Sequence, residues 1–310
     1  MIKTVFMGTP DFAMEALRYA YENTELKLVI TKEDKANLRG KKIQFSPVKE
    51  FAIKNNIRYI QPKSIRSEEV IDLIKSLDVD LIIVAAYGKI IPKSLIDLPK
   101  YGIINVHSSL LPKYRGAAPI QAALRQGDKK TGVTIMQIDE GLDTGDILSM
   151  SEVDILESDN LVTLTTKLSK LSYGLLKDTV NDIVLGKVTK IKQDDSKASI
   201  VKLIKKEEAN INWSNSTEDI FNLIRAIYSN PTAYTSINNK RIKIYESKKI
   251  DKKYDSVGVV VDLIKDGPVI STKDGALLIT LAQFEGKKQE KGRDIVNGRK
   301  LKIGDKCHGY

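Results

Sequence analysis

Short apolar stretches that alternate with helical patterns constrain the fold of this chain more than any other feature. Lys3–Met7, Leu26–Thr31 and Asp80–Tyr87 are rich in apolar and β-branched residues. Such continuous runs are typical of strands that are buried on both faces of a parallel sheet. Amphipathic helical patterns at 11–21 and 67–77 lie between these strands. The alternation predicts an α/β domain with a doubly wound, Rossmann-like sheet.

The same sheet is expected to continue through three further strands and one long helix. Residues 160–185 carry leucines at three- and four-residue steps. This stripe spans too few heptads for a coiled coil, so we expect a helix that packs along the sheet. The further strands are expected at Gly102–Ser108, Gly132–Ile138 and Ile147–Val153.

The pattern changes after a polar, lysine-rich stretch at 186–199, which is typical of a linker. Ser216–Asp219 has the residue types of a capping box at the start of a helix. Short apolar strands separated by turn residues follow, and these are typical of a small, OB-like β-barrel. We therefore predict an N-terminal domain at 1–188, a linker at 189–206 and a smaller β-barrel domain at 207–310.

Composition limits the chemistry that this chain can support. Cys307 is the only cysteine, so no disulfide can form within the chain. With His107 and His308 as the only histidines, a Cys/His zinc site cannot be assembled, and we expect no metal. No stretch approaches the roughly 18 apolar residues of a membrane span, and the first residues are typical of a strand rather than a secretory signal. These features predict a cytoplasmic protein without membrane contact, and we expect a monomer.

The net charge of +10 is concentrated toward the C-terminal end of the chain. Residues 201–310 hold 21 Lys and Arg against 14 Asp and Glu, a balance of +7. A basic surface of this kind favours a polyanionic partner such as nucleic acid. A lysine-rich composition that only aids solubility accounts for the charge equally well.

Asn105, His107 and Asp143 are the candidate reactive residues. Polar residues appear at the carboxyl end of the strand that contains Asn105, where ligands bind in open α/β sheets. Asn105, His107 and Ser109 are two residues apart and should share a face of that strand. An amide beside an imidazole suits the stabilisation of an oxyanion, and Asp143 in a later glycine-containing loop would raise the pKa of His107 and orient its ring. A structural histidine and an ordinary turn explain the same residues.

The turn at 8–10 occupies the place of a dinucleotide-binding fingerprint. Such a fingerprint needs three glycines in the pattern Gly-x-Gly-x-x-Gly, and Pro10 and Ala13 stand where the second and third would be. We therefore interpret the turn as structural, which argues against a nicotinamide-dependent oxidoreductase.

Several blocks of the chain resemble one enzyme family. Four central blocks are Asn105–His107, Ser109–Pro112, Arg115–Ile120 and Thr131–Gly145. In this order and spacing they resemble the formyltetrahydrofolate-dependent formyltransferases, and the resemblance covers both predicted domains. Three further blocks are similar to the members of this family that formylate methionyl initiator tRNA: Phe6–Ala13, Leu38–Lys42 and Ser46–Lys49.

The resemblance implies a reaction and a role for each reactive residue. The formyl donor would be 10-formyltetrahydrofolate, and the acceptor would be the free amino group of methionyl initiator tRNA. Asn105 and His107 would hydrogen-bond the formyl oxygen as it becomes an oxyanion, and Asp143 would hold His107 and assist proton transfer from the amine. Three segments would enclose the folate: Tyr87, Gly88 and Ile90; Ser109, Leu110, Leu111 and Pro112; and Asp139 and Gly141.

The resemblance also implies that a basic loop contacts the acceptor end of the tRNA. Arg39, Lys41 and Lys42 lie between a predicted strand and helix, and contacts with phosphate groups would position the substrate. The basic β-barrel domain would extend this tRNA-binding surface. Two residues depart from the family pattern: Ser108 replaces the glycine that often follows the histidine, and Thr232 stands where many members carry an aromatic residue.

Three other functions fit parts of the sequence. An amino-sugar N-formyltransferase shares the fold and the folate donor, but the basic loop at 38–42 suits tRNA better than a nucleotide sugar. A glycinamide-ribonucleotide formyltransferase is disfavoured, because that resemblance would end with the first domain. A non-catalytic RNA-binding protein belongs to a different class, and the intact Asn105, His107 and Asp143 argue against it.

Overall fold

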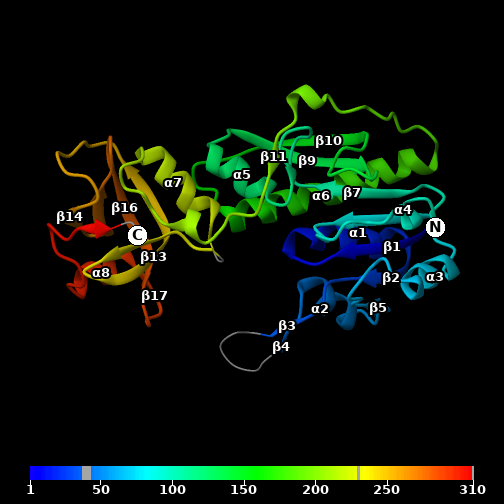
Figure 1. Cartoon of the computed structure of the whole chain (residues 1–310), viewed down its shortest axis with the longest axis horizontal. Coiled ribbons are helices and arrows are strands. Elements are labelled where there is room, and N and C mark those ends of the chain that lie inside the picture. The colour runs from blue at the N-terminus through cyan, green and yellow to red at the C-terminus, as the bar shows by residue number, and fades with distance from the viewer. Residues whose placement is uncertain (37–42, 229–230, 309–310) are drawn as a thin grey trace. The chain divides into compact units, whose positions relative to one another are not determined.

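The computed structural model describes residues 1–36, 43–228 and 231–308 (Figure 1). The chain divides into two compact units and passes between them more than once. Unit 1 comprises Met1–Pro119, Lys130–Asp154 and Leu164–Val201, and unit 2 comprises Ile120–Lys129, Ile155–Thr163 and Lys202–Tyr310. Among the helices of the described residues, none is both long and apolar enough to cross a membrane.

Unit 1 contains the doubly wound sheet that the sequence predicts. Its strands, in the order of the sheet, are β10 (Ile147–Asp154), β9 (Lys130–Gln137), β7 (Ile103–His107), β6 (Leu81–Ala85), β1 (Lys3–Gly8), β2 (Glu25–Ile30) and β5 (Tyr59–Ile60). From β1 the chain adds β2 and β5 on one side, and it then returns to place β6 and β7 on the other. These strands are parallel, whereas β9 runs antiparallel to β7 and β10 antiparallel to β9, so the sheet is mixed.

Helices connect and cover the strands of unit 1. They are α1 (Met14–Asn23), α2 (Pro47–Lys54), α3 (Glu68–Ser76), α4 (Lys93–Ile96) and α6 (Leu161–Val184). α3 buries Val70 and Ile74 in a core that it shares with one face of the sheet. α6 lies beside α1, where the ring of Tyr173 packs edge-on against Tyr19 at a centroid distance of 5.8 Å. The long helix expected at 160–185 is therefore confirmed as α6, packed within the unit rather than in a coiled coil.

The first helical segment begins later than its periodicity predicts. The pattern at 11–21 starts as a 3-10 turn, η1 (Asp11–Ala13), before α1 follows. The preceding Gly8 lies in close packing, because a Cβ atom there would come within 2.9 Å of both Ala13 Cβ and the Ala85 carbonyl oxygen. A side chain at this position would displace backbone, which supports the structural interpretation of the turn.

Unit 2 is built on a curled antiparallel sheet that forms a half-barrel, which confirms the expected smaller, barrel-like β-domain. Its strands, in the order of the sheet, are β14 (Val260–Ile264), β15 (Gly267–Ser271), β16 (Ala276–Phe284), β13 (Lys240–Ile250), β12 (Tyr234–Ile237) and β18 (Cys307–His308), with β17 (Gln289–Lys291) beside β16. The hairpin between β12 and β13 turns at Asn238 and Asn239, whose φ angles are +50° and +60°. Asparagine tolerates this left-handed conformation, so the predicted turn forms.

Helix α7 packs within unit 2, and several short elements complete the chain. α7 (Thr217–Ala226) begins at a cap, where Ser216 Oγ accepts a hydrogen bond from the Asp219 amide at 3.1 Å. This cap confirms the predicted helix start. The other short elements of the chain are β3 (Lys35–Ala36), β4 (Ile43–Gln44), β8 (Arg115–Gly116), α5 (Pro119–Gln126), η2 (Asp195–Lys197), β11 (Ile200–Val201), η3 (Glu207–Ala209) and α8 (Gly292–Asn297).

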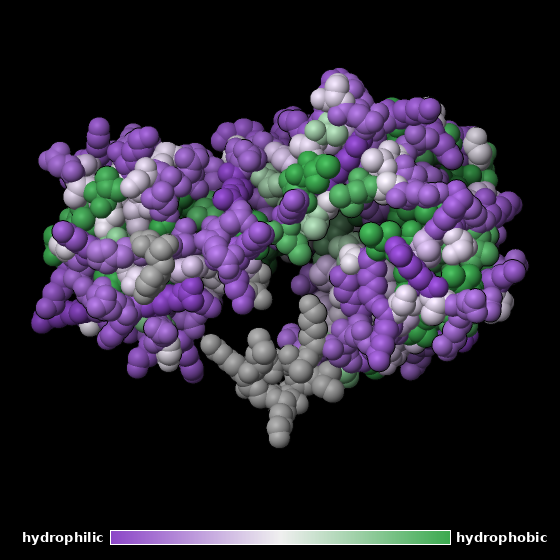
Figure 2. All heavy atoms as spheres, viewed as in Figure 1, coloured by the Kyte–Doolittle hydropathy of each residue, from purple (hydrophilic) through white to green (hydrophobic). Residues whose placement is uncertain are grey.

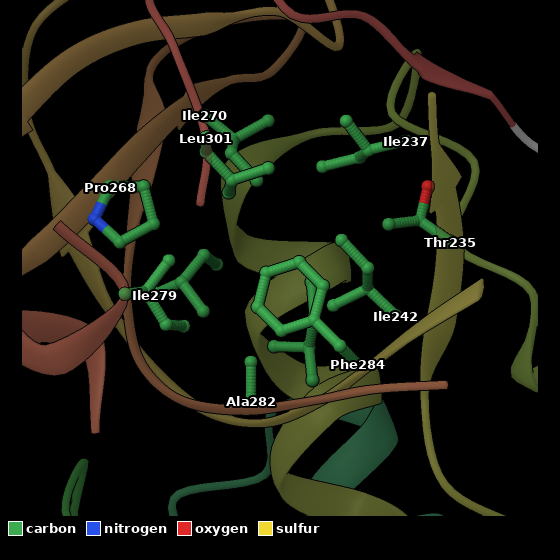
Figure 3. Close-up of a pocket in the computed structure, with 11 residues that line it drawn as sticks. Thr235, Ile237, Ile242, Pro268, Ile270, Ile279, Ala282, Phe284 and Leu301 are labelled. Atoms are coloured by element: carbon green, nitrogen blue, oxygen red, sulfur yellow. The ribbon is translucent and has the colours of Figure 1, made fainter. Parts of the chain in front are cut away.

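The interior of the half-barrel is apolar. Trp213 is buried there, and its indole N–H donates to Thr235 Oγ1 at 3.0 Å. A cavity of about 10 Å³ lies there. Figure 3 shows side chains that line it, such as Ile242, Ile279 and Phe284. A cavity of this size is at the lower limit for a single water molecule, and its lining offers too few polar partners to hold one. We therefore interpret it as a packing void rather than a ligand site.

The polar stretch expected to link the domains is built into unit 1 as far as Val201. Ile191 forms an antiparallel bridge with Ile147 at the start of β10. Strand β11 (Ile200–Val201) pairs in parallel with β8 (Arg115–Gly116). The segment therefore contributes backbone and side chains to the region that follows β7, where the candidate reactive residues lie.

Candidate active site

β7 presents Asn105 and His107 on one face of the sheet. Side chains alternate along a strand, so these two residues share a face with Ile103. Ile103 is fully buried in the core, His107 is 5% exposed, and Asn105 is partly buried. The polar pair therefore lies where the apolar core on this face ends.

The loop between β9 and β10 brings Asp143 to this pair. β9 runs antiparallel to β7, so the loop begins beside Ile103, whose carbonyl accepts a hydrogen bond from the Ile138 amide at 2.8 Å. The loop then returns toward the middle of β7. Asp143 Oδ1 accepts a hydrogen bond from Asn105 Nδ2 at 3.4 Å, and Asp143 Oδ2 lies 3.7 Å from His107 Nδ1. The three candidate residues therefore meet on one face of the sheet, beside the middle of β7 at Asn105 as well as its carboxyl end at His107.

Each ring nitrogen of His107 faces an oxygen atom, but only Nε2 is close enough for a hydrogen bond. Nε2 lies 2.9 Å from the Tyr114 carbonyl oxygen, which can only accept a hydrogen bond, so Nε2 carries the proton of the neutral ring. Nδ1 is then the unprotonated nitrogen that faces Asp143. Burial lowers the pKa of His107 below its ordinary value, and it outweighs the Asp143 carboxylate and the Tyr114 carbonyl, which both raise that pKa. Asp143 therefore raises the pKa of His107 as expected, but the net shift is downward, because the burial of the imidazolium has the larger effect.

This buried imidazole predicts a pH-dependent stability. The pKa of His107 is lower in the folded protein than in the unfolded chain, where it is about 6.5. As the pH falls below that value, the unfolded chain takes up a proton that the folded protein does not. The free energy of unfolding should therefore decrease by at most ~1.4 kcal/mol per pH unit from this residue.

Urea unfolding at about pH 7.5 and pH 5.5 tests this pH dependence. The decrease in the free energy of unfolding should be smaller in His107→Gln than in the wild-type protein. His308→Gln is the matched control, because it removes the other histidine, which is exposed. The same decrease in all three proteins would contradict the prediction.

The loop that carries Asp143 has a constrained backbone. Asp143 itself has φ +53°, a left-handed conformation that residues other than glycine seldom adopt. Within the loop, the Asp139 carboxylate accepts hydrogen bonds from the Gly141 amide at 3.0 Å and from Thr144 Oγ1 at 2.8 Å. From outside, the Gly116 amide donates to Asp143 Oδ2 at 2.8 Å. The direction of the carboxylate is therefore set by β8 as well as by the loop.

Two further residues hold this loop, and sequence reasoning gave neither of them a role. Gln193 Nε2 donates to the carbonyl oxygens of Asp143 and Gly145, each at 2.8 Å. Arg115 Nε donates to Gln193 Oε1 at 3.0 Å. Arg115 lies in a block that resembles the family, and this resemblance could have indicated a role for it. Gln193 lies in the lysine-rich stretch 186–199, where no local pattern distinguishes it.

One of the segments expected to enclose folate follows β6 and contains Tyr87, Gly88 and Ile90. Tyr87 is 1% exposed, and its hydroxyl has no hydrogen-bond partner among the described residues. Ile90 is 72% exposed, which is unusual for an apolar side chain of this size. Lys93 Nζ lies 2.6 Å from Glu140 Oε1, so the segment adjoins the loop that carries Asp143. An exposed apolar side chain therefore lies in a segment next to the reactive residues.

The segment of Ser109, Leu110, Leu111 and Pro112 forms the turn after β7. Ser109 and Leu111 are buried, and Ser109 Oγ donates to the Lys113 carbonyl at 2.6 Å. Leu110 and Pro112 are partly exposed. Backbone and partly exposed side chains of this turn are therefore available to a ligand, whereas Ser109 is occupied within the turn.

The remaining expected site residues divide into two groups. Asp139 and Gly141 are exposed in the loop that carries Asp143, where the Asp139 carboxylate bonds within the loop. Arg39, Lys41 and Lys42 lie outside the described residues. Across residues 1–36, 43–228 and 231–308, no group of three or more His, Cys, Asp or Glu side chains could hold a metal ion.

Comparisons with known proteins identify the family of this chain. Residues 3–180 match the model of the formyl transferase family, and residues 203–300 match the model of the formyl transferase C-terminal domain. A methionyl-tRNA formyltransferase from Fusobacterium nucleatum subsp. nucleatum is 46% identical over 308 residues, which cover 98% of this chain and 99% of that protein. A methionyl-tRNA formyltransferase from Bacillus subtilis (strain 168) is 44% identical over 308 residues, which cover 98% of this chain and 97% of that protein.

A solved structure of a different formyltransferase is similar in fold. It is a sugar 3N-formyl transferase, determined in the presence of dTDP and 5-N-formyl-THF. Its TM-score is 0.67 and its sequence identity is 25%, with 93% of this chain and 99% of that chain covered. The sequence is thus closer to the two methionyl-tRNA enzymes than to the sugar enzyme. The chain belongs to the formyl transferase family, and within it to the methionyl-tRNA formyltransferases.

Proposed function

We propose that this protein transfers a formyl group from 10-formyltetrahydrofolate to the free amino group of methionyl initiator tRNA. The observation that carries this proposal is the convergence of Asn105, His107 and Asp143 in a chain that is 46% identical to a methionyl-tRNA formyltransferase. An amide and an imidazole that both lie within 3.7 Å of one carboxylate suit the transfer of an acyl group to an amine.

The reaction moves one formyl group and one proton. The amine nitrogen forms a bond to the formyl carbon, and the bond between that carbon and N10 of the folate breaks. The amine loses a proton, and N10 gains one. Asp143 and the unprotonated Nδ1 of His107 face each other at 3.7 Å, so this pair can accept the proton from the amine and return it to the leaving nitrogen.

The amide of Asn105 is the donor best placed for the oxyanion. Its Nδ2 carries two N–H groups, and only one of them is needed for the 3.4 Å contact with Asp143. The other can donate to the formyl oxygen as negative charge develops there. His107 has its Nε2 proton on the Tyr114 carbonyl, so it could donate to the oxyanion only after releasing that bond. We therefore assign the oxyanion contact to Asn105 and the proton transfer to His107 and Asp143.

The surroundings of these residues fit a folate. When bound, 10-formyltetrahydrofolate would supply a formyl group activated by its attachment to N10. Ile90 and Leu142, which are 72% and 55% exposed, offer apolar surface for a flat ring. The unpartnered hydroxyl of Tyr87 and the backbone of the turn at 109–112 offer polar groups for its edge.

The basic character of unit 2 fits a nucleic-acid acceptor. Residues 201–310 carry a balance of +7, and Figure 2 shows that the viewed face of this unit is mainly hydrophilic. Lysine and arginine side chains on such a surface would neutralise tRNA phosphates. We further propose that Arg39, Lys41 and Lys42 contact the acceptor end of the tRNA, where they would position the aminoacyl group.

A formylation assay tests the proposed function. The protein is incubated with 10-formyltetrahydrofolate and initiator tRNA charged with methionine, and formylmethionine is measured after hydrolysis of the ester. We expect product with charged initiator tRNA and none with uncharged tRNA or with 5-formyltetrahydrofolate as the donor. A nucleotide-linked amino sugar is offered as the competing acceptor. Turnover of the sugar without formylation of the tRNA would overturn the proposal in favour of the amino-sugar alternative, and binding of tRNA without any turnover would favour the RNA-binding alternative.

A further inference from the structure

We infer that Gln193 is a positioning residue whose side-chain amide holds the loop of Asp143 in its working conformation. The inference rests on the proposed function, because it takes Asp143 as the residue that acts on the amine. Gln193 comes from the stretch at 186–199, which is distant in the sequence from both β7 and the loop. Its contacts join three parts of unit 1 around a single carboxylate.

The amide of Gln193 uses both of its ends. Nε2 donates to the carbonyl oxygens of Asp143 and Gly145, both at 2.8 Å, and Oε1 accepts from Arg115 Nε at 3.0 Å. The reversed amide would place an oxygen against two carbonyl oxygens and an N–H against a guanidinium. The surrounding groups therefore settle its orientation. Glutamine suits this position because the end of its side chain offers two N–H donors for the carbonyl oxygens and one acceptor for Arg115.

Arg115 connects this amide to the carboxylate of Asp143. The Arg115 side chain is buried, and its guanidinium also lies 2.7 Å from Asp195 Oδ1. The next residue, Gly116, donates its amide to Asp143 Oδ2 at 2.8 Å. Gln193 and β8 therefore hold Asp143 from two sides, one at the backbone carbonyl and the other at the carboxylate.

The loop needs such support for two physical reasons. The left-handed backbone of Asp143, with φ +53°, is unfavourable for a residue with a side chain and persists only where neighbours impose it. The contacts of Asp143 with Asn105 and His107 are also long, at 3.4 and 3.7 Å. A small displacement of the loop would break them, and a displacement of about 1 Å can lower a reaction rate about 100-fold.

The test replaces Gln193 by methionine, which has similar length and no hydrogen-bonding amide. We expect kcat for formylation to fall about 10- to 100-fold, while KM for folate and tRNA stays within about threefold. Gln193→Glu is the second variant, because it retains the acceptor for Arg115 but replaces the two N–H donors with a negatively charged oxygen that faces the carbonyl oxygens of Asp143 and Gly145. Gln126→Met, on the exposed end of α5, is the matched control and should behave as the wild-type protein.

A double-mutant cycle separates positioning from a general structural defect. If Gln193 acts through Asp143, Gln193→Met should lower the single-turnover rate in the wild-type protein and have almost no further effect in an Asp143→Asn background. An equal loss in both backgrounds would overturn the inference, as would an unchanged kcat in Gln193→Met and Gln193→Glu. A wild-type protein that formylates no methionyl-tRNA would instead contradict the proposed function.

A measurement without substrate completes the test. The chain has only two histidines, so the imidazole nitrogen signals of His107 and His308 can be assigned by substitution. We expect Gln193→Met to shift the Nδ1 signal of His107, which faces Asp143, and to leave His308 unchanged. Unchanged signals from both rings would show that the loop keeps its place without Gln193, whether or not the protein is active.

Discussion

Replacing Asp143 by asparagine is expected to lower kcat for formylation by about 10²- to 10⁴-fold. Asparagine has nearly the same shape, and its amide oxygen can still accept the Gly116 amide that now bonds Asp143 Oδ2 at 2.8 Å. It cannot take up a proton from the attacking amine, and it removes the negative charge that faces His107. KM should change little, because the lost interaction acts in the transition state. Single-turnover rates with saturating folate and charged tRNA measure the effect.

The control for this substitution is Asp182→Asn, which neutralises an exposed carboxylate on α6. This variant should retain the wild-type rate, and thermal unfolding of both proteins checks that the fold is intact. A rate for Asp143→Asn within tenfold of the wild-type rate would remove Asp143 from the reaction.

Replacing Asn105 by alanine is expected to lower kcat by about 10²- to 10³-fold, the usual cost of losing one oxyanion donor. The partly buried amide is the only side-chain group in this arrangement with a proton free to donate, because the Nε2 proton of His107 is held by the Tyr114 carbonyl. The same substitution removes the 3.4 Å hydrogen bond to Asp143, so part of the loss reflects that contact.

Asn181→Ala, on the exposed face of α6, controls for a general effect of removing an amide. A kcat for Asn105→Ala close to the wild-type value would mean that His107 supplies the oxyanion donor after all, by releasing Tyr114. The Asn105→Ala substitution therefore tests the oxyanion contact, and Asp143→Asn tests the proton transfer.

The main sheet could be predicted because burial on both faces leaves a direct mark on the sequence. The strands expected at Lys3–Met7 and Asp80–Tyr87 appear as β1 and β6. The predicted strand extends two residues beyond the end of β6 at Ala85. Ala86 adopts a left-handed backbone with φ +47°, and alanine gives no indication of such a conformation in the sequence. α8, at Gly292–Asn297, was not predicted, because six residues are too few for a helical period to be recognised.

The candidate site was predictable only in part. Asn105 and His107 were recognisable as a pair because residues two apart on a strand share a face. Asp143 is distant in the sequence, so its glycine-containing loop only suggested it as a partner, and the family resemblance then strengthened that assignment. Gln193 carried no signal of either kind, since a glutamine in a polar stretch is ordinary until the stretch is seen to fold against the loop of Asp143.

The sequence by itself determined the α/β sheet, the second β-rich unit and the family, because these follow from local periodicity and from residues in a fixed order. The protonation of His107 and the support of Asp143 were decided only by the tertiary structure. Both depend on groups that come from other segments, such as the Tyr114 carbonyl and the Gln193 amide. The pKa of an imidazole depends on how much solvent its neighbours exclude, and those neighbours are known only once the chain has folded.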